Sequence, residues 1–227
     1  LGGRDLKEKV GGISMLRAIK MLEEDDDTRL IILVSKPPSP SVEQKVLDYV
    51  SKNCKKKYIV NFVGGNEAEA QKRELMFAGT LEQAALKAAE IMGGKPPARI
   101  DTAEIVNLAL ASFKKDEKYL RGLFSGGTLA DESQIILRNQ IGTVFSNISV
   151  YPEMKLKNPW TSEKNTIIDL GDDEFTRGRP HPMIDNTLRK ERIIQEAKDP
   201  ETAVILLDVV LGYGAHIDTA GELLEAI

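Results

Sequence analysis

Short apolar runs alternate with amphipathic stretches along most of this chain. Ile13, Leu16, Ile19 and Leu22 fall on one face of a helix, and the following run at residues 30–34 is short and β-branched. This run predicts a strand buried on both faces. Further strands are predicted at residues 58–63, 119–124, 143–148, 166–170 and 203–209. Helices are predicted at residues 42–50, 67–75, 81–92, 102–113, 129–138 and 184–197, with a short one beginning near residue 218.

Local polar residues predict where several helices begin. Ser41 with Gln44 and Thr80 with Gln83 have the spacing of capping boxes, and Asp101 is placed to cap the helix at 102–113. The alternation of strands and helices is typical of an α/β protein with mainly parallel sheets and helices on both faces.

The segment Gly-Gly-Lys-Pro-Pro at residues 93–97 interrupts this alternation. We therefore expect a first domain at residues 1–95, a linker helix within 96–117 and a second domain at 118–227. Residues 1–34 and 170–207 also share one layout, in which a glycine motif, a helix, an acidic turn and an apolar run follow one another. Such a repeat predicts two similar units with a site between them.

Composition narrows the function classes. The net charge of −4 and the aromatic content of 5% argue against nucleic-acid or anionic-membrane binding. The lone Cys54 favours a reducing, cytoplasmic compartment, and no apolar stretch reaches the ~20 residues that span a bilayer. Because the chain begins at Leu1 and stops within a helical pattern, we expect a fragment of a longer polypeptide, with both domains truncated.

Two glycine-bearing turns are candidate anion sites. Ser125, Gly126, Gly127 and Thr128 stand between a strand and a helix, where free amides can face a carboxylate or phosphate. A tight turn that needs glycine for packing explains them equally well. Gly212, Tyr213 and Gly214 follow the last predicted strand in the same way. For the corresponding turn of the first domain, at residues 64–66, we favour a structural role over ligand binding.

The densest polar cluster lies at residues 169–182. Arg177 and Arg179 can clamp an anion, and His181 can serve as acid, base or nucleophile. A salt-bridged surface loop is the alternative. No two-histidine spacing supports a metal site, so we expect none. His216 is interpreted as structural, and the turn Lys55–Lys56–Lys57 as a solvated connector rather than a binding patch.

Several of these motifs resemble the FdrA proteins. The similar segments are residues 1–6, 10–14, 35–38, 125–129, 168–185 and 206–212. FdrA proteins are similar to the succinyl-CoA synthetase superfamily, the NDP-forming acyl-CoA synthetases. The resemblance implies an upstream CoA-binding Rossmann domain and two flavodoxin-like, three-layer ligase-type domains.

The resemblance also implies a function. The leading hypothesis is an acyl-CoA synthetase-type ligase that handles an acyl phosphate and a small carboxylate on glycine loops between two ligase domains. The superfamily's phosphohistidine motif corresponds to residues 74–80, which contain no histidine. The second hypothesis is therefore a subunit of an oxamate carbamoyltransferase in anaerobic allantoin breakdown, which uses preformed carbamoyl phosphate. The third is a non-catalytic subunit that binds CoA or partner subunits.

The cofactors implied by the resemblance are CoA with ATP or another acyl phosphate source, accompanied by Mg²⁺. The expected partners are a small carboxylate or acyl phosphate and other subunits of an oligomeric enzyme complex. We expect the fragment alone to be inactive.

Overall fold

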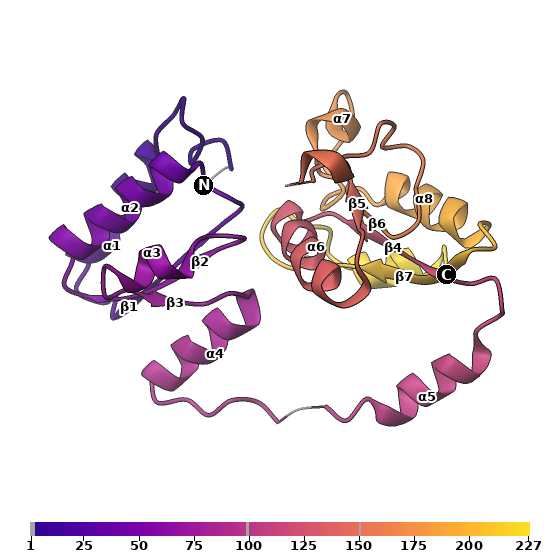
Figure 1. Cartoon of the computed structure of the whole chain (residues 1–227), viewed down its shortest axis with the longest axis horizontal. Coiled ribbons are helices and arrows are strands. Elements are labelled where there is room, and N and C mark those ends of the chain that lie inside the picture. The colour runs from indigo at the N-terminus through magenta and orange to yellow at the C-terminus, as the bar shows by residue number, and fades with distance from the viewer. Residues whose placement is uncertain (1–2, 99, 150) are drawn as a thin grey trace. The chain divides into compact units, whose positions relative to one another are not determined.

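The structure is a computed structural model that describes residues 3–98, 100–149 and 151–227. It divides into two compact units, unit 1 (Leu1–Arg99) and unit 2 (Ile100–Ile227) (Figure 1). Both units are built on purely parallel sheets flanked by helices. The predicted α/β class is thus confirmed. Leu1 and Gly2 of the first glycine motif lie outside the described residues.

Unit 1 has a three-stranded sheet in the order β1-β2-β3. Helices α1 and α2 cover one face of this sheet, and α4 covers the other. Its elements are α1 (Ile13–Glu24), β1 (Leu30–Ser35), α2 (Pro40–Asn53), β2 (Lys57–Phe62), α3 (Glu67–Gln71), β3 (Met76–Phe77) and α4 (Leu81–Ile91).

Burial of β1 differs from the prediction. Ile31 and Leu33 pack into the core beneath α1 and α2, but Ile32 and Val34 are 40% and 42% exposed. Burial of this strand on both faces is therefore wrong. The physical reason is that β1 is an edge strand, and the core under α4 is built from β2, β3 and only Leu30 of β1.

The predicted helix starts are partly correct. The Thr80 hydroxyl accepts a hydrogen bond from the Gln83 amide, which confirms this cap of α4. The capping box at Ser41 is wrong, because α2 begins at Pro40 after Ser39 and the Ser41 hydroxyl donates to Glu8 instead. Proline at the first helical position fixes that start, because its missing N–H would be unpaired there anyway.

Unit 2 has a four-stranded sheet in the order β5-β6-β4-β7. Helix α6 covers one face, and α8 and α9 cover the other. The elements of unit 2 are α5 (Ala103–Ser112), β4 (Tyr119–Phe124), α6 (Gly127–Ile141), β5 (Phe145–Ser146), a 3₁₀ turn (Pro152–Met154), β6 (Thr166–Asp169), α7 (Asp173–Thr176), α8 (Thr187–Ala197), β7 (Thr202–Leu207) and α9 (Thr219–Leu224).

The strands of unit 2 are short and apolar, and their buried faces form two clusters. Leu123 and Ile168 pack under α8 and α9, whereas Phe124 and Ile167 pack under α6. Within the described ranges, none of the helices has the length and apolar character needed to cross a membrane.

Candidate functional site

The candidate site of unit 2 lies at the carboxyl ends of β6, β4 and β7. These three strands are neighbours and all run parallel, so the turns that follow them meet at one edge of the sheet. The Leu170 amide after β6 donates to the Phe124 carbonyl at the end of β4, at 2.8 Å. Ligands bind at such an edge in open α/β sheets, where chain connections diverge on either side of a strand.

The first two amides of the Ser125 turn are occupied by the protein itself. The Asp208 carboxylate, directly after β7, accepts hydrogen bonds from the Ser125 amide at 2.8 Å and the Gly126 amide at 2.7 Å. It also accepts from the Ser125 hydroxyl at 3.1 Å. The prediction that this turn offers free amides is therefore wrong for Ser125 and Gly126.

Asp208 is in turn neutralised by Arg189 of α8. Both side chains are buried, and the Arg189 guanidinium donates to an Asp208 carboxylate oxygen at 3.0 Å and to the Asp208 carbonyl at 2.7 Å. Burial lowers the pKa of Arg189, and the Asp208 charge opposes that shift. This pair was not found from the sequence. The available signal was a carboxylate placed directly at the end of an apolar strand.

Two amides of the turn remain as candidates for a ligand. Gly127 and Thr128 are the first residues of α6, are only half-buried, and have amide groups without an intrahelical acceptor. Among the described residues, no backbone hydrogen bond satisfies these two amides. They lie at the positive end of a 15-residue helix, which favours a negatively charged group.

His181 lies against this turn, through Gly171. A Cβ added at Gly171 would be 2.5 Å from the His181 Nε2 and 2.9 Å from the Ser125 carbonyl oxygen. Only glycine therefore allows the imidazole to come this close. Gly171 itself is held by its amide, which donates to the Asp169 carboxylate at 2.9 Å.

The contacts of His181 also identify its tautomer. The Met183 amide donates to the His181 Nδ1 at 3.2 Å, so Nδ1 carries a lone pair and the proton of the neutral ring is on Nε2. The half-buried imidazole thus presents an N–H donor on the side of Gly171 and the Ser125 turn. An Nε2 that carries the proton suits a hydrogen-bond donor better than a nucleophile.

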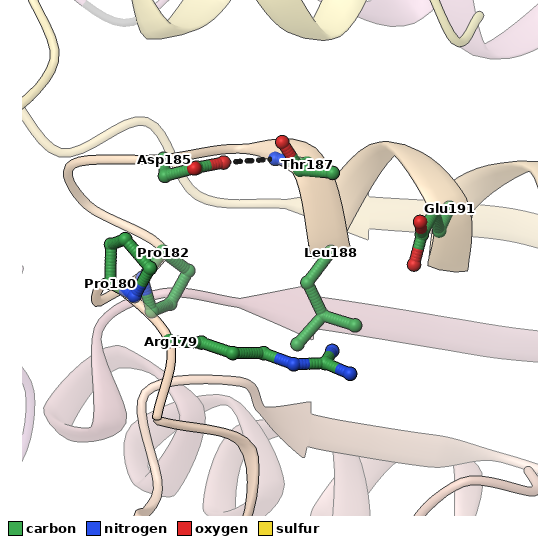
Figure 2. Close-up of a pocket in the computed structure, with 7 residues that line it drawn as sticks. All are labelled: Arg179, Pro180, Pro182, Asp185, Thr187, Leu188 and Glu191. Atoms are coloured by element: carbon green, nitrogen blue, oxygen red, sulfur yellow. Dashed lines mark hydrogen bonds between the residues drawn. The ribbon is translucent and has the colours of Figure 1, made fainter. Parts of the chain in front are cut away.

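The two arginines that are predicted to clamp an anion lie in the loop after α7, and their binding role stays a prediction. The Arg179 guanidinium lies 5.8 Å from the centre of the Trp160 ring and lines a hollow of about 240 Å³ on the side of α8 (Figure 2). The hollow is also lined by Pro180, Pro182, Asp185, Thr187, Leu188 and Glu191. Arg177 is exposed. Within the described part of the chain, the side chain that hydrogen-bonds to the Ser125 turn is Asp208 rather than either arginine.

Among the described residues, the contacts between the Gly212 loop and the Ser125 turn are made where the loop begins. Asp208 bonds the turn, and a Cβ added at Gly126 would be 3.8 Å from the Val210 side chain. Gly212, Tyr213 and Gly214 are exposed, Tyr213 completely so. The His216 Nδ1 accepts a hydrogen bond from the Asp218 amide at 3.1 Å, and the His216 Nε2 lies 3.5 Å from a Glu222 carboxylate oxygen. These contacts are in keeping with the structural role expected for His216.

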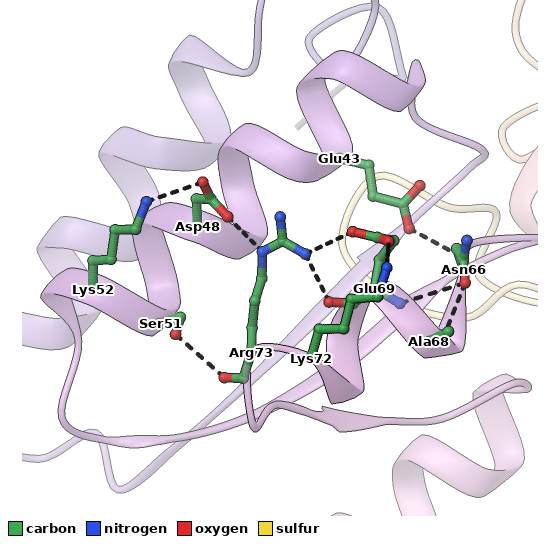
Figure 3. Close-up of polar contacts among 9 residues, drawn as sticks. All are labelled: Glu43, Asp48, Ser51, Lys52, Asn66, Ala68, Glu69, Lys72 and Arg73. Atoms are coloured by element: carbon green, nitrogen blue, oxygen red, sulfur yellow. Dashed lines mark hydrogen bonds and ion pairs between the residues drawn. The ribbon is translucent and has the colours of Figure 1, made fainter.

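The corresponding turn of unit 1 is closed by internal contacts. The Asn66 side-chain oxygen caps α3 by accepting hydrogen bonds from the backbone amides of Ala68 and Glu69. The backbone amide of Asn66 donates to the Glu43 carboxylate (Figure 3). Arg73 links this segment to α2 through Asp48. Residues 64–66 therefore have the structural role that the sequence favours.

Comparison with known proteins agrees with this architecture. Residues 123–227, which contain the carboxyl ends of β4, β6 and β7, match the model of the CoA-ligase family. Over 230 residues the chain is 46% identical to the Escherichia coli (strain K12) protein named "Uncharacterized protein YahF". That alignment covers 100% of this chain and 44% of YahF, so the chain spans less than half the length of this curated relative.

Proposed function

We propose that the protein is an acyl-CoA synthetase-type enzyme of the FdrA family, and that the carboxyl edge of the unit 2 sheet handles an acyl phosphate and a small carboxylate. The observation that carries this proposal is the His181 Nε2–H beside Gly171 and the Ser125 turn. Together with the Gly127 and Thr128 amides, it supplies three N–H donors at one sheet edge. The CoA-ligase match over residues 123–227 supports the same reaction class.

In this proposal the donors act on the leaving phosphate. Attack of the acceptor nucleophile on the acyl carbon breaks the bond between that carbon and the phosphate oxygen, and negative charge builds up on the oxygen. The Gly127 and Thr128 amides and the His181 Nε2–H stabilise this charge without needing to reorganise. Asp208 and Arg189 hold the turn in place, and their charges offset one another.

CoA and ATP belong to the family in general, but this edge does not fit either of them well. Both carry several phosphates, and the cation that contacts the Ser125 turn through Asp208 is Arg189, which is fully buried and already paired. We therefore assign a single phosphate or carboxylate to this edge and no residue of it to CoA or ATP.

The tautomer of His181 favours a second candidate, a subunit of an oxamate carbamoyltransferase. A protonated Nε2 does not take up a phosphoryl group, and residues 74–80 lack the superfamily histidine. Transfer from preformed carbamoyl phosphate needs no phosphohistidine.

Two reaction mixtures separate these candidates. The full-length protein with its partner subunits is supplied with carbamoyl phosphate and oxamate, and separately with CoA, ATP and a carboxylic acid. Product in only the second mixture supports the ligase, and product in only the first supports the carbamoyltransferase. Product in neither favours a non-catalytic subunit and refutes both.

The role of the site is tested with His181→Gln and Gly171→Ala in whichever mixture turns over. We expect each to lower kcat by roughly 10²–10³-fold, the range for the loss of one oxyanion donor. Gly79→Ala is the matched control, because its added Cβ would make only an ordinary contact of 3.4 Å with Gln83. Equal activity of all three variants, each folded by circular dichroism, would refute the assignment.

A further inference from the structure

Unit 1 has a basic hollow at the amino ends of its strands, on the edge of its sheet opposite to the Gly64 turn. Arg29 directly precedes β1, Lys57 begins β2, and Leu30 pairs with Lys57 in the sheet register. The hollow has a volume of about 410 Å³. Its lining residues are Arg29, Lys55, Lys56, Lys57, Ile91 and Met92.

Lys56 is used to build the hollow rather than to bind. Its ammonium group donates to the Leu22 carbonyl at 2.8 Å and to the Asp25 carbonyl, both at the end of α1. The neighbouring Glu23 carboxylate is also occupied by internal contacts, because it accepts hydrogen bonds from the Lys55 amide, the Lys56 amide and the Tyr58 hydroxyl. These contacts fix the backbone from which the other basic side chains project.

Three cationic side chains in this hollow are not part of an ion pair within the described part of the chain. In the described residues, the side chains of Arg29, Lys55 and Lys57 have no carboxylate within ion-pair distance. Asp25 is bonded to Thr28, and Asp26 and Asp27 are in the same turn as Arg29 but do not line the hollow.

The charge and shape of the hollow indicate the chemical class of its ligand. One phosphate group carries about 1.5 to 2 negative charges near pH 7, so two linked phosphates balance three cations. The volume is within the ~300–1,000 Å³ typical of small-molecule sites. The half-buried Ile91 and the 43% exposed Met92 add an apolar wall at the end of α4.

We propose that this hollow binds the diphosphate group of a small organic molecule, with the organic part against Ile91 and Met92. The proposal concerns unit 1 alone and is independent of the reaction assigned to unit 2. Lys55 and Lys57 flank the diphosphate, and Arg29 offers a forked pair of donors to one of its phosphates.

Inorganic diphosphate is the probe that tests the charge recognition. The 227-residue chain is titrated with it by calorimetry, and backbone amide shifts are followed by NMR. We expect saturable binding with shifts concentrated at residues 29 and 55–57. Lys55→Ala and Arg29→Gln should each weaken binding by about tenfold, the loss expected for one charge-assisted contact.

Lys9→Ala is the matched control, since it removes the same charge from an exposed residue at the opposite end of α1. We expect it to change the affinity by less than about twofold, in line with a distant screened charge. Equal affinities for the chain carrying Lys55→Ala and the chain carrying Lys9→Ala would overturn the proposal. An oligoglutamate peptide that binds more tightly than diphosphate would also overturn it and would identify the hollow as a contact for an acidic protein segment.

Discussion

The buried pair Asp208–Arg189 gives the sharpest stability prediction. Asp208→Asn keeps the size of the side chain but removes its charge, and its NH₂ group replaces one of the two acceptors that face Ser125, Gly126 and Arg189. One donor of the site is then left without an acceptor, and Arg189 becomes a buried cation without a counter-charge. The perturbation therefore acts on the geometry of the candidate site and on the core of unit 2 together.

The expected cost follows from the burial of both partners, 6% exposed for Asp208 and 0% for Arg189. Breaking a buried ion pair by removing one partner costs about 3–5 kcal/mol, because the remaining charge is uncompensated. A domain of this size has a urea m-value of roughly 2 kcal/mol/M, so the midpoint should fall by about 2 M.

Trp160 makes this loss measurable in unit 2 alone. It is the single tryptophan of the chain, and its ring packs edge-to-face on Phe175 with the ring centres 4.8 Å apart. Urea unfolding followed by Trp160 fluorescence therefore reports on unit 2. Asp116→Asn, an exposed aspartate of the same unit, is the matched control and should cost less than about 0.5 kcal/mol.

A double variant distinguishes the ion pair from the hydrogen bonds to the turn. Adding Arg189→Met removes the stranded charge, so the double variant should lose less stability than the sum of the two single variants. Additive losses, or a loss below about 1 kcal/mol for Asp208→Asn alone, would refute the reasoning.

Three further predictions concern the rest of the fold. The Asp5 carboxylate accepts hydrogen bonds from the Ser14 and Met15 amides at the start of α1. Burial raises the pKa of Asp5, but these hydrogen bonds outweigh burial and lower it below its ordinary value. The stabilisation by Asp5 is therefore present above the unfolded pKa of about 3.9 and is lost as the pH falls through the lowered pKa of the folded state. Asp5→Ala should therefore cost about 1 kcal/mol at pH 6 and less at pH 3 by circular dichroism, and a pH-independent difference would contradict this. Thr80→Ala should cost about 1 kcal/mol in urea unfolding through loss of the α4 cap, whereas Thr102, which makes no side-chain cap, should tolerate alanine. Gly122→Ala should cost about 1–3 kcal/mol in Trp160-detected unfolding, because its Cβ would meet the Ile167 side chain at 2.3 Å, and an unchanged midpoint would disprove this crowding.

The sequence predicted what local patterns determine. The apolar runs gave the positions of the longer strands, and Thr80 with Gln83 gave a helix start, because each signal lies within a few neighbouring residues. The face of a strand that stays exposed is not local. Ile32 and Val34 are as apolar as Ile31 and Leu33, but they lie on the opposite face of the sheet. That face stays exposed at β1 because β1 is an edge strand.

The candidate site was predicted only in part for the same reason. Ser125, Gly126 and His181 were singled out, but Asp208 is 83 residues from Ser125 along the chain, and no spacing rule connects the two. The approach of His181 to Gly171 depends on how the loop after β6 folds back. The binding roles of Gly127, Thr128, Arg177, Arg179 and residues 212–214 stay predictions.

The most direct test of the central claim is a crystal structure of the full-length protein soaked with inorganic phosphate. We predict a phosphate within hydrogen-bond distance of the Gly127 and Thr128 amides and of the His181 Nε2, with the Asp208–Arg189 pair intact. Density for phosphate elsewhere in unit 2, with this edge empty at saturating concentration, would contradict the account.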